Sequence, residues 1–587
     1  MQSLTSDHVM VIAIDFGTTY SGYAFSLGVE FESEPTKISS NKPWIASQGL
    51  VSHKTPTCVL LKPDASFYKF GYEAEDRYNE IAESDDLNHK DYYFFRRFKM
   101  VLHSRPNLRR ETVIEDETGK TMEAMIVFEH GIRYLKNHAL STINTQGKCI
   151  DEMDIHWVLT VPAIWSEGAK QFMREAAQKA GIESNNLSIA LEPEAASVYC
   201  KYLPSHQLTQ EQMSKSMFQP NAKYMVVDLG GGTADITVHK VESDNSLCEV
   251  HGPSGGAWGG TKVDEAFIKF LEEIFGEDIM KVFLDKHMED AIDLYREFEI
   301  RKRKVMLDMS DTPNMAIKIP VALYELYEDK HKSKVKDDIK RHAKYKDRVT
   351  CLADKMKIDS NIMKSFFKRP LYDLVEHMRD ILGELPVRGT NTFIIVGGFA
   401  ESGIVQDTIK SKFSNMRVII PFDAGLAVLK GAVIFGHAPM VVTSRVCRRT
   451  YGMAVTKAFI KGQYPEDRKE FMGNREVVRN VFHRYMQLGQ PTKVGEAVST
   501  VPMSAAKGQS LARVRVFSSK CSCPEFVTDR GCSYLGEIIV NIPDSEQEEG
   551  GTVDVKMTFG GTELAVEALE KKSGKSYRSR FDFLSGE

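Results

Sequence analysis

The sequence predicts an α/β protein of two related lobes followed by a smaller β-rich region. A glycine-containing hairpin that begins with an aspartate occurs twice, and the two aspartates, Asp15 and Asp228, lie 213 residues apart (228 − 15). Such a long internal repeat indicates duplicated units. After about residue 439, short runs of alternating apolar residues replace the helical patterns. We therefore expect lobes over residues 1–222 and 223–438 and a β-rich domain over 439–587.

The second hairpin has the composition of a phosphate-binding turn. An apolar strand, Met225–Val227, leads to Asp228, and the returning strand alternates through Ile236 and Val238. The turn between them contains Gly230, Gly231, Gly232 and Thr233. Consecutive glycines allow positive φ values, so several backbone N–H groups can point at one anion. A carboxylate beside such a turn suits hydrated Mg²⁺. A tight turn without a ligand would also explain a single glycine run.

A hairpin of the same design begins the chain. The strand Val9–Ile14 runs into Asp15, and the chain returns through Tyr23–Phe25. The turn contains Gly17, Thr18, Thr19 and Tyr20. Because an acidic phosphate-type turn occurs in each half, we expect two lobes that close on one nucleotide.

The overall composition is that of an ordinary soluble protein with an extensive core. The chain has 587 residues, of which 42% are apolar and 27% charged. Its net charge of −5 gives no general reason to expect nucleic-acid or anionic-membrane binding. It has no apolar run long enough to span a membrane and no basic N-terminal stretch, so neither a membrane span nor a secretory signal is expected. These features favour a cytoplasmic protein, with access to the nucleus left open.

The cysteines favour reduced thiols over a disulfide framework. Their number, nine, is odd, and most are isolated in the sequence, as Cys58 and Cys149 are. The one cluster, Cys521, Cys523 and Cys532, lacks a fourth close ligand and is a poor zinc set.

The first lobe is predicted to alternate helices with buried strands. Helices are expected around Glu73–Ala82, at Phe128–Leu140 and at Ser166–Gly181, where the serine is a suitable N-cap and the glycine a C-terminal stop. Asp154–Pro162 has the pattern of a buried strand ended by proline. The aromatic run Asp91–Met100 is typical of buried packing.

The second lobe is predicted to contain a charged helix over about Asp290–Met306. Spacings of three and four residues place three of its charged side chains on one face: Glu299, Lys302 and Arg303. The basic run Arg301–Lys304 could be a nuclear signal or a nucleic-acid patch, although a solvated helix face is the commoner explanation. The insert Lys330–Arg348 is most simply a solvated helix or a mobile loop.

The two hairpins resemble the phosphate signatures of the seventy-kilodalton heat-shock chaperones, within the actin-like ATPase superfamily. The resemblance extends over about residues 9–436 and is carried further by Val161–Ala163, Leu191–Ala196, Phe393–Gly398 and Asp423–Gly431. Phe98–Met100 and Gly397–Glu401 are similar to a divergent branch of that family, heat shock 70 kDa protein 12. The resemblance implies a two-lobed actin-like ATPase domain of duplicated ribonuclease H-like topology.

The resemblance also implies roles in phosphate binding and hydrolysis. Backbone N–H groups of the two turns would hold the β- and γ-phosphates of ATP, and Asp15 and Asp228 would hold Mg²⁺ through water. Lys99 falls where the chaperones carry the lysine that reaches the γ-phosphate, although Arg96 or Arg97 could be the counterpart. The catalytic residues implied are Lys99, Glu192, Asp15, Asp228 and Thr233.

For Glu192, a plain surface carboxylate is the alternative to a place beside the metal and the attacking water. Because Pro193 follows it, the sequence predicts an extended backbone there.

Around the nucleotide, the resemblance implies a wider set of contacts with ATP or ADP. The residues implied are Gly17, Thr18, Thr19, Tyr20, Gly230, Gly231, Gly232, Gly259, Gly260, Glu299, Lys302, Arg303, Gly397 and Gly398. One position departs from the family. The chaperones stack an arginine on adenine shortly after the double glycine, and this chain has Glu401 at that offset. The affinity for adenine, or its mode of binding, is therefore expected to differ.

The C-terminal region is predicted to be a small β-sandwich. Its expected strands include Arg513–Phe517, Gly536–Ile542 and Val553–Phe559. The linker and helical lid of ordinary chaperones have no convincing counterpart from Met440 onward.

These observations favour an ATP-binding, slowly hydrolysing chaperone-like protein of the stress response. Lobe closure would signal the nucleotide state to a C-terminal domain that binds a protein client or signalling partner. The alternative is a nucleotide-gated interaction scaffold with little or no ATPase activity, favoured by Glu401 and the missing linker. A small-molecule kinase on the same superfamily fold is a third and weaker alternative.

Overall fold

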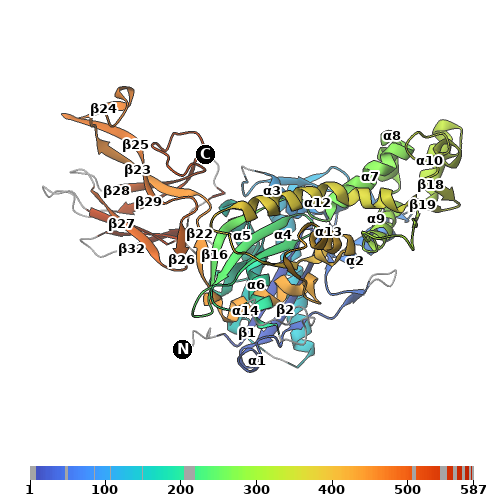
Figure 1. Ribbon diagram of the computed structural model, residues 1–587, viewed down its shortest axis with the longest axis horizontal. Coiled ribbons are helices and arrows are strands. Elements are labelled where there is room, and N and C mark those ends of the chain that lie inside the picture. The colour runs from blue at the N-terminus through green and yellow to red at the C-terminus, as the bar shows by residue number, and fades with distance from the viewer. Residues whose placement is uncertain are drawn as a thin grey trace. The chain divides into compact units, whose positions relative to one another are not determined.

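The protein forms two compact units, seen in a computed structural model (Figure 1). The structure describes residues 8–45, 51–84, 86–105, 108–147, 150–203, 218–504, 511–541, 552–558, 565–570, 576–580 and 583–584, so Cys149 lies outside it. The first unit comprises Met1–Trp165, Phe172–Thr237 and Ser254–Pro439. The second comprises Ser166–Gln171, Val238–Pro253 and Met440–Glu587.

The first lobe is organised on a mixed sheet. Its strands are β1 (Met10–Phe16), β2 (Tyr20–Leu27), β3 (Ser39–Ser40), β6 (Thr55–Pro56), β12 (Ile155–Val161) and β13 (Leu187–Leu191). The strand order is β13-β12-β1-β2-β3, and β6 also pairs with β2. β1 runs parallel to β12 and antiparallel to β2, and β12 runs parallel to β13. The predicted N-terminal hairpin is thus confirmed as β1 and β2.

The second lobe repeats this topology. Its strands are β14 (Lys223–Leu229), β15 (Ala234–Val241), β20 (Thr392–Val396) and β21 (Arg417–Ile419), in the order β21-β20-β14-β15. β14 runs parallel to β20, and β20 runs parallel to β21. In each lobe the first strand of the glycine hairpin therefore lies between its returning strand and a later parallel strand. This shared order confirms the duplication that the two hairpins predict.

Helices that follow the last parallel strand of each lobe meet between the sheets. They are α6 (Glu192–Tyr202) after β13 and α14 (Ala427–His437) after β21. A Cβ atom on Gly431 of α14 would lie 1.7 Å from the carbonyl oxygen of Ala195 in α6, so only glycine allows this approach. α14 also packs on the first-lobe sheet, where Val11, Ala13 and Val158 share a core cluster with it.

Two further layers extend the lobes. The first-lobe extension contains β7 (Cys58–Leu61), β8 (Phe67–Phe70), β9 (Tyr93–Arg96), α2 (Tyr72–Ala82), α3 (Val101–Ser104) and α4 (Ala124–Thr145). The second-lobe extension contains α7 (Thr261–Phe275), α8 (Glu277–Lys286), α9 (Met288–Lys302), β17 (Asn314–Lys318), α10 (Val321–His331), α11 (Val335–Ile339), β18 (Val349–Leu352), β19 (Lys355–Asp359), α12 (Ser360–Gly383) and α13 (Gly403–Lys412). Phe94, Phe95 and Phe98 of the aromatic run are buried, as predicted.

The insert Lys330–Arg348 is more ordered than the sequence suggests. It is neither only a solvated helix nor a mobile loop, because Val335, Ile339 and Tyr345 are buried. The two aliphatic residues lie four apart on α11, so one face packs inward while Lys336 and Asp337 between them stay exposed.

The helix predicted at Ser166–Gly181 forms as α5 (Glu167–Lys179). The Ser166 hydroxyl accepts a hydrogen bond from the backbone N–H of Ala169 at 3.2 Å, and Gly181 has a φ of +89°. Both predicted end signals therefore act as expected. No helix within the described parts of the chain is long and apolar enough to cross a membrane.

The second unit is built mainly from strands. They are β16 (Leu247–Gly256), β22 (Val442–Val446), β23 (Thr450–Ala458), β24 (Lys469–Met472), β25 (Arg475–Met486), β26 (Pro491–Lys493), β27 (Ala497–Ser504), β28 (Leu511–Ser519), β29 (Cys532–Asn541), β30 (Thr552–Thr558), β31 (Ala565–Glu570) and β32 (Ser576–Arg580). One sheet has the order β24-β25-β23-β28-β29 and another the order β27-β30-β31-β32. Met453 and Val516 of the former share a core with Val555 and Met557 of the latter, as in a sandwich. Ile542 and Phe559, predicted strand ends, lie outside the described residues.

Candidate functional site

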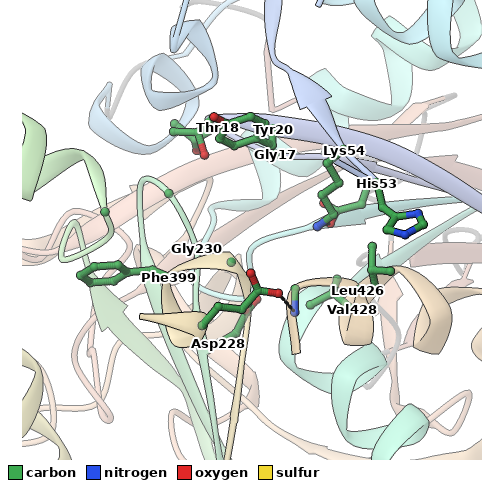
Figure 2. Close-up of a pocket in the computed structure, with 18 of the residues that line it drawn as sticks. Gly17, Thr18, Tyr20, His53, Lys54, Asp228, Gly230, Phe399, Leu426 and Val428 are labelled. Carbon is green, nitrogen blue, oxygen red and sulfur yellow. Dashed lines mark hydrogen bonds and ion pairs between the residues drawn. The ribbon is translucent and has the colours of Figure 1, made fainter. Parts of the chain in front are cut away.

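One large cavity in the first unit gathers the predicted site. It has a volume of about 1030 Å³ and is lined by every residue of the predicted set except Gly259. Figure 2 shows Gly17, Thr18 and Tyr20 of the first hairpin on one side and Asp228 and Gly230 of the second on the other. Residues 213 positions apart (228 − 15) thus face one space, as expected for two lobes around one ligand.

The glycine turn of the second lobe is held by the loop before α7. The carbonyl oxygens of Gly230, Gly231 and Gly232 accept hydrogen bonds from the backbone N–H groups of Gly260 (3.2 Å), Thr261 (2.8 Å) and Gly259 (3.2 Å), respectively. These carbonyls already have donors, so an anion in the cavity does not face unpaired carbonyl oxygens. The arrangement fits a phosphate group beside the turn.

Gly259 therefore acts behind the cavity wall, and we expect Gly259→Ala to damage the site indirectly. A Cβ atom there would lie 2.4 Å from the carbonyl oxygen of Gly231, which is backbone and cannot move aside cheaply. The substitution should lower the free energy of unfolding by about 1–3 kcal/mol, measured by urea denaturation, and weaken nucleotide binding. Gly383→Ala is the matched control, because a Cβ atom at Gly383 meets nothing within 4 Å. Equal stability of the two variants would contradict this account.

Several carboxylates are concentrated at the base of the cavity. Asp15 and Asp228 are both buried. Burial raises the pKa of Asp228 well above its usual range, and the nearby carboxylates of Glu192, Asp235 and Asp15 raise it further. Asp228 forms no ion pair with any described residue, and the nearby charge of Lys54 offsets only part of the upward shift of its pKa. Such a donor set fits a hydrated Mg²⁺ ion.

A buried lysine–glutamate pair lies beside these aspartates. Lys99 Nζ donates to Glu192 Oε1 at 3.0 Å, and the Lys99 side chain is only 2% exposed. The ammonium group also lies 4.9 Å from the ring centroid of Trp165. Burial raises the pKa of Glu192 to about 7, although Lys99 opposes the shift. A carboxylate with a pKa near neutrality can orient a water and take up a proton.

The extended conformation predicted at Glu192 is wrong. Glu192 is the first residue of α6, and the extended residue is Leu191, the N-cap. Pro193 does not exclude this geometry, because a proline at the start of a helix loses no intrahelical hydrogen bond and its fixed φ suits the helix. The helix start directs the Glu192 carboxylate into the cavity, so it is not a plain surface group.

Charged side chains of α9 line another wall of the cavity. Glu299 pairs with Arg303 at 2.8 Å, and Lys302 Nζ lies 2.7 Å from Asp264 Oδ1. Burial would raise the pKa of Glu299, but Lys302 and Arg303 outweigh it and hold the pKa at about 2. The predicted helix face therefore forms one ion network, in which Asp264 and Glu299 hold the side chains of Lys302 and Arg303 in place.

Glu401 occupies an ordered position near this network. Its Oε1 accepts a hydrogen bond from the backbone N–H of Gly425 at 3.1 Å. The neighbouring Ser402 is buried, and its hydroxyl has no hydrogen-bond partner among the described residues. Both residues line the cavity, so a nucleoside here would meet a carboxylate and an unpaired hydroxyl in place of a stacking arginine.

Sequence patterns did not identify two lysines that line the cavity. Lys54, between β5 (Val51–Ser52) and β6, pairs with Asp15 at 2.6 Å. Lys430 of α14 pairs with Asp423, which also accepts a hydrogen bond from the Tyr199 hydroxyl at 2.8 Å. Lys54 belongs to no motif with a characteristic spacing. Lys430 lies within the family-like stretch Asp423–Gly431, but that stretch alone does not mark it as a lysine of the cavity.

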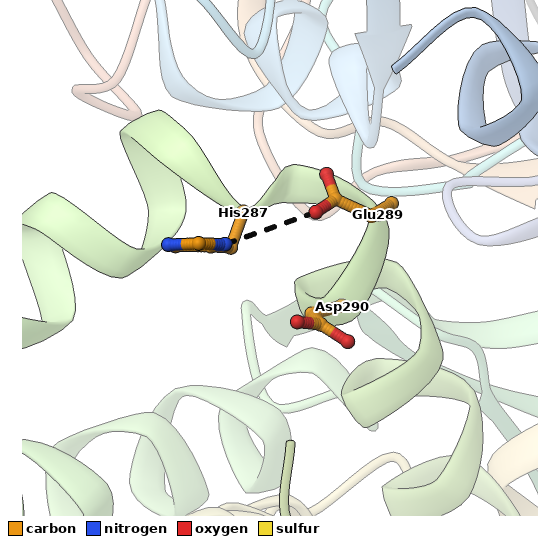
Figure 3. A group of neighbouring side chains, drawn as sticks. All are labelled: His287, Glu289 and Asp290. Carbon is orange, nitrogen blue, oxygen red and sulfur yellow. Dashed lines mark ion pairs between the residues drawn. The ribbon is translucent and has the colours of Figure 1, made fainter. Parts of the chain in front are cut away.

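A separate group of possible metal ligands lies outside the cavity, at the N-terminal end of α9 (Figure 3). The ligand atoms of His287, Glu289 and Asp290 lie within 4.8 Å of one another. His287 Nδ1 is 3.9 Å from a Glu289 carboxylate oxygen. No second observation indicates a bound ion, and half-buried acidic groups of this kind are common, so we assign it no function.

Comparison with known proteins gives consistent matches. A family model described as Hsp70 protein matches residues 97–437. The chain is 34% identical to heat shock 70 kDa protein 12B of Homo sapiens, over 98% of this chain and 91% of that protein. It is 32% identical to heat shock 70 kDa protein 12A of Mus musculus, over 98% and 92% of the respective chains. A chaperone protein dnaK of Emiliania huxleyi is 23% identical over 72% of this chain and 64% of that protein.

Proposed function

The chain belongs to the Hsp70 family, and from that premise we propose that it is a slow, magnesium-dependent ATPase whose lobe closure signals the nucleotide state to its β-rich unit. At the level of the family, it is an ATP-binding, chaperone-like protein. The proposal further assigns it to the cytoplasm, with a protein client or signalling partner at the β-rich unit.

The observation that carries the proposal is the buried pair of Lys99 and Glu192 beside two aspartates. Lys99 Nζ donates to Glu192 Oε1 at 3.0 Å, and burial raises the pKa of this carboxylate to about 7. Titratable groups with shifted pKa values are concentrated at catalytic sites, so the pair favours hydrolysis over nucleotide binding alone. Phosphoryl transfer depends mainly on position and charge neutralisation, and this group of residues can provide both.

The residues of the cavity have distinct tasks in this proposal. Backbone N–H groups of Gly17–Thr19 and Gly230–Thr233 hold the β- and γ-phosphates. Glu192 orients a water for in-line attack and accepts its proton, and Lys99 stabilises the charge that develops on the γ-phosphate. Asp15 and Asp228 would hold a hydrated magnesium ion, which would supply charge neutralisation at the phosphate oxygens. The products are ADP and phosphate.

Ion pairs between the lobes support the closure part of the proposal. Arg97 of the first lobe lies 2.7 Å from Asp264 of α7. Arg296 of α9 lies 2.9 Å from both Glu75 and Asp76 of α2. Asp264 also pairs with Lys302 in the cavity wall, so a ligand that changes that wall also changes an interlobe contact. β15 begins directly after the glycine turn, and from Val238 on its residues belong to the second unit, which gives a continuous covalent route for the signal.

The proposal makes hydrolysis pH-dependent. The Glu192 carboxylate must be ionised to accept a proton, and its pKa is raised to about 7 by burial. We therefore expect kcat/KM to rise with pH and to level off above about pH 8. Glu192→Gln should be slow at every pH and should lack this rise. A wild-type profile that is flat between pH 6 and 8 would contradict the role of Glu192.

A titration calorimetry experiment with Mg-ATP and Mg-ADP, paired with a phosphate-release assay, tests the function. We expect both nucleotides to bind and phosphate to be released above the background rate. Failure of both nucleotides to bind would refute the proposal.

Nucleotide binding without phosphate release would select the second candidate, a nucleotide-gated scaffold. The ordered carboxylate of Glu401 at the stacking position favours that candidate, because a changed nucleoside contact suits a binding switch as well as an enzyme.

A further inference from the structure

Lys54 supplies a positive charge at the base of the cavity, next to a predicted metal-binding aspartate. It lies in the first-lobe segment between β5 and β6, and its side chain reaches into the cavity (Figure 2). Its Nζ donates to Asp15 Oδ2 at 2.6 Å. The other carboxylate oxygen of Asp15 accepts a hydrogen bond from the Thr160 hydroxyl at 3.1 Å. Both oxygens of Asp15 are therefore engaged by the protein itself.

The ammonium group of Lys54 still has hydrogen-bonding capacity. A lysine ammonium has three donors, and among the described residues Lys54 Nζ donates only to Asp15. The Lys54 side chain is 18% exposed, and that exposure faces the cavity, since the residue lines it. Its free N–H groups are thus available to a ligand.

The ion pairs of the site make Lys54 different from Lys99. Lys99 forms an ion pair with Glu192, and its side chain is almost wholly buried. Asp228 has no cationic partner within the described chain. Lys54 therefore neutralises one of the two aspartates expected to share a hydrated metal ion, and leaves the other open. A purely structural ion pair would have no reason to line a cavity that also contains two phosphate-type turns.

We propose that Lys54 is a phosphate-contacting cation that takes over part of the charge neutralisation otherwise supplied by magnesium, so that this chain binds ATP with only a weak magnesium requirement. The inference rests on the proposed function. Phosphate oxygens carry more charge than one carboxylate and accept strong, charge-assisted hydrogen bonds from an ammonium group. Lys54 can donate to them with its free N–H groups while it keeps Asp15, or can transfer from Asp15 to the phosphates.

The test measures the affinity of the full chain for ATP by titration calorimetry, once with excess magnesium chloride and once with EDTA. For the wild type, we expect removal of magnesium to raise Kd by less than about tenfold. For Lys54→Gln, we expect it to raise Kd by more than about a hundredfold, because a charge-assisted contact to phosphate is lost. Lys54→Arg keeps the charge, so removal of magnesium should raise its Kd by the same factor as for the wild type. Lys42→Gln, at an exposed lysine between β3 and β4 (Trp44–Ile45), is the matched control.

Three outcomes would overturn the inference. If ATP binding by the wild type in EDTA is as weak as that of Lys54→Gln, Lys54 does not replace magnesium. Tighter binding by Lys54→Gln in both buffers would mean that Lys54 only blocks the site. The ratio of the Kd values of the wild type with EDTA and with magnesium requires no substitution. It therefore tests the inference even if the Lys54→Gln variant does not fold. If the wild type binds no nucleotide even with magnesium, the proposed function fails first, and this inference fails with it.

Discussion

The Asp228→Asn variant should unfold at a higher temperature than the wild type without nucleotide, yet lose roughly a hundredfold to a thousandfold in its rate of ATP hydrolysis. Stability should rise while the hydrolysis rate falls, because the carboxylate contributes to ligand binding and does not stabilise the folded protein. It is buried next to Glu192, Asp235 and Asp15 and forms no ion pair with a described residue. The amide has nearly the same shape without the charge, so the free energy of unfolding should increase by about 1 kcal/mol.

The pH dependence gives this prediction a second measurement. Burial and the neighbouring carboxylates raise the pKa of Asp228 in the folded protein above its value in the unfolded chain. The stability contributed by the protonated group is therefore present at low pH and is lost as the pH rises above the usual range of an aspartate. The difference in stability between Asp228→Asn and the wild type should widen as the pH increases, which thermal melts at several pH values can measure.

Asp329→Asn is the matched control for this substitution. Asp329 is exposed on α10, far along the chain from the hairpins, so its amide variant should change neither melting temperature nor turnover. If Asp228→Asn were less stable than the wild type without nucleotide, the carboxylate would be a structural group. If it still hydrolysed ATP at the wild-type rate, Asp228 would have no part in the chemistry.

The duplicated fold was predictable because its signal is local. Each hairpin combines an apolar strand, an aspartate and a glycine turn within some twenty residues, and the strand order of both sheets confirms the repeat. Sequence spacing also identified the helix face that carries Glu299 and Lys302, since positions three apart on a helix share a face whatever the rest of the chain does.

The sequence did not predict contacts made by residues far apart along the chain. Lys54 pairs with Asp15, 39 residues earlier (54 − 15), and no local pattern marks a lysine as the partner of a distant aspartate. Sequence spacing alone could not predict the contact between Glu192 and Lys99 either, because the two residues lie 93 positions apart and only the family resemblance connects them. The error at Glu192 has a different cause. The proline that follows it favours an extended residue in general but is also tolerated in the first turn of a helix, and here the helix begins one residue before it.

The insert Lys330–Arg348 shows how composition can mislead. Its many lysines and aspartates suggested a solvated segment, yet two aliphatic residues four apart and one tyrosine are enough to bury one face of it. Ion pairs also connect charged side chains of the insert to neighbouring elements, as between Lys344 and Glu273 of α7 at 2.6 Å. A few correctly spaced apolar residues therefore decide whether a charged segment packs.

The Lys99→Met variant should lose roughly a hundredfold to a thousandfold in turnover and about 3 kcal/mol of stability. The loss of stability follows from burial. Lys99 is 2% exposed, and its removal leaves the Glu192 carboxylate in a buried position without its partner. Lys99 opposes the upward shift of the pKa of Glu192, so that pKa should rise further in the variant. Urea denaturation measures the loss of stability, and phosphate release measures the loss of turnover.

A double variant separates the two effects. Lys99→Met combined with Glu192→Gln removes both charges, so it should recover most of the lost stability while turnover stays as low as in the single variant. Lys136→Met is the control for burial alone. Lys136 is also buried and pairs with Glu152 at 2.7 Å, but it does not line the cavity, so its loss should cost stability and leave turnover unchanged. Recovery of turnover in the double variant would show that the pair acts only in the fold. A stable double variant without turnover would assign the same two charges to the chemistry.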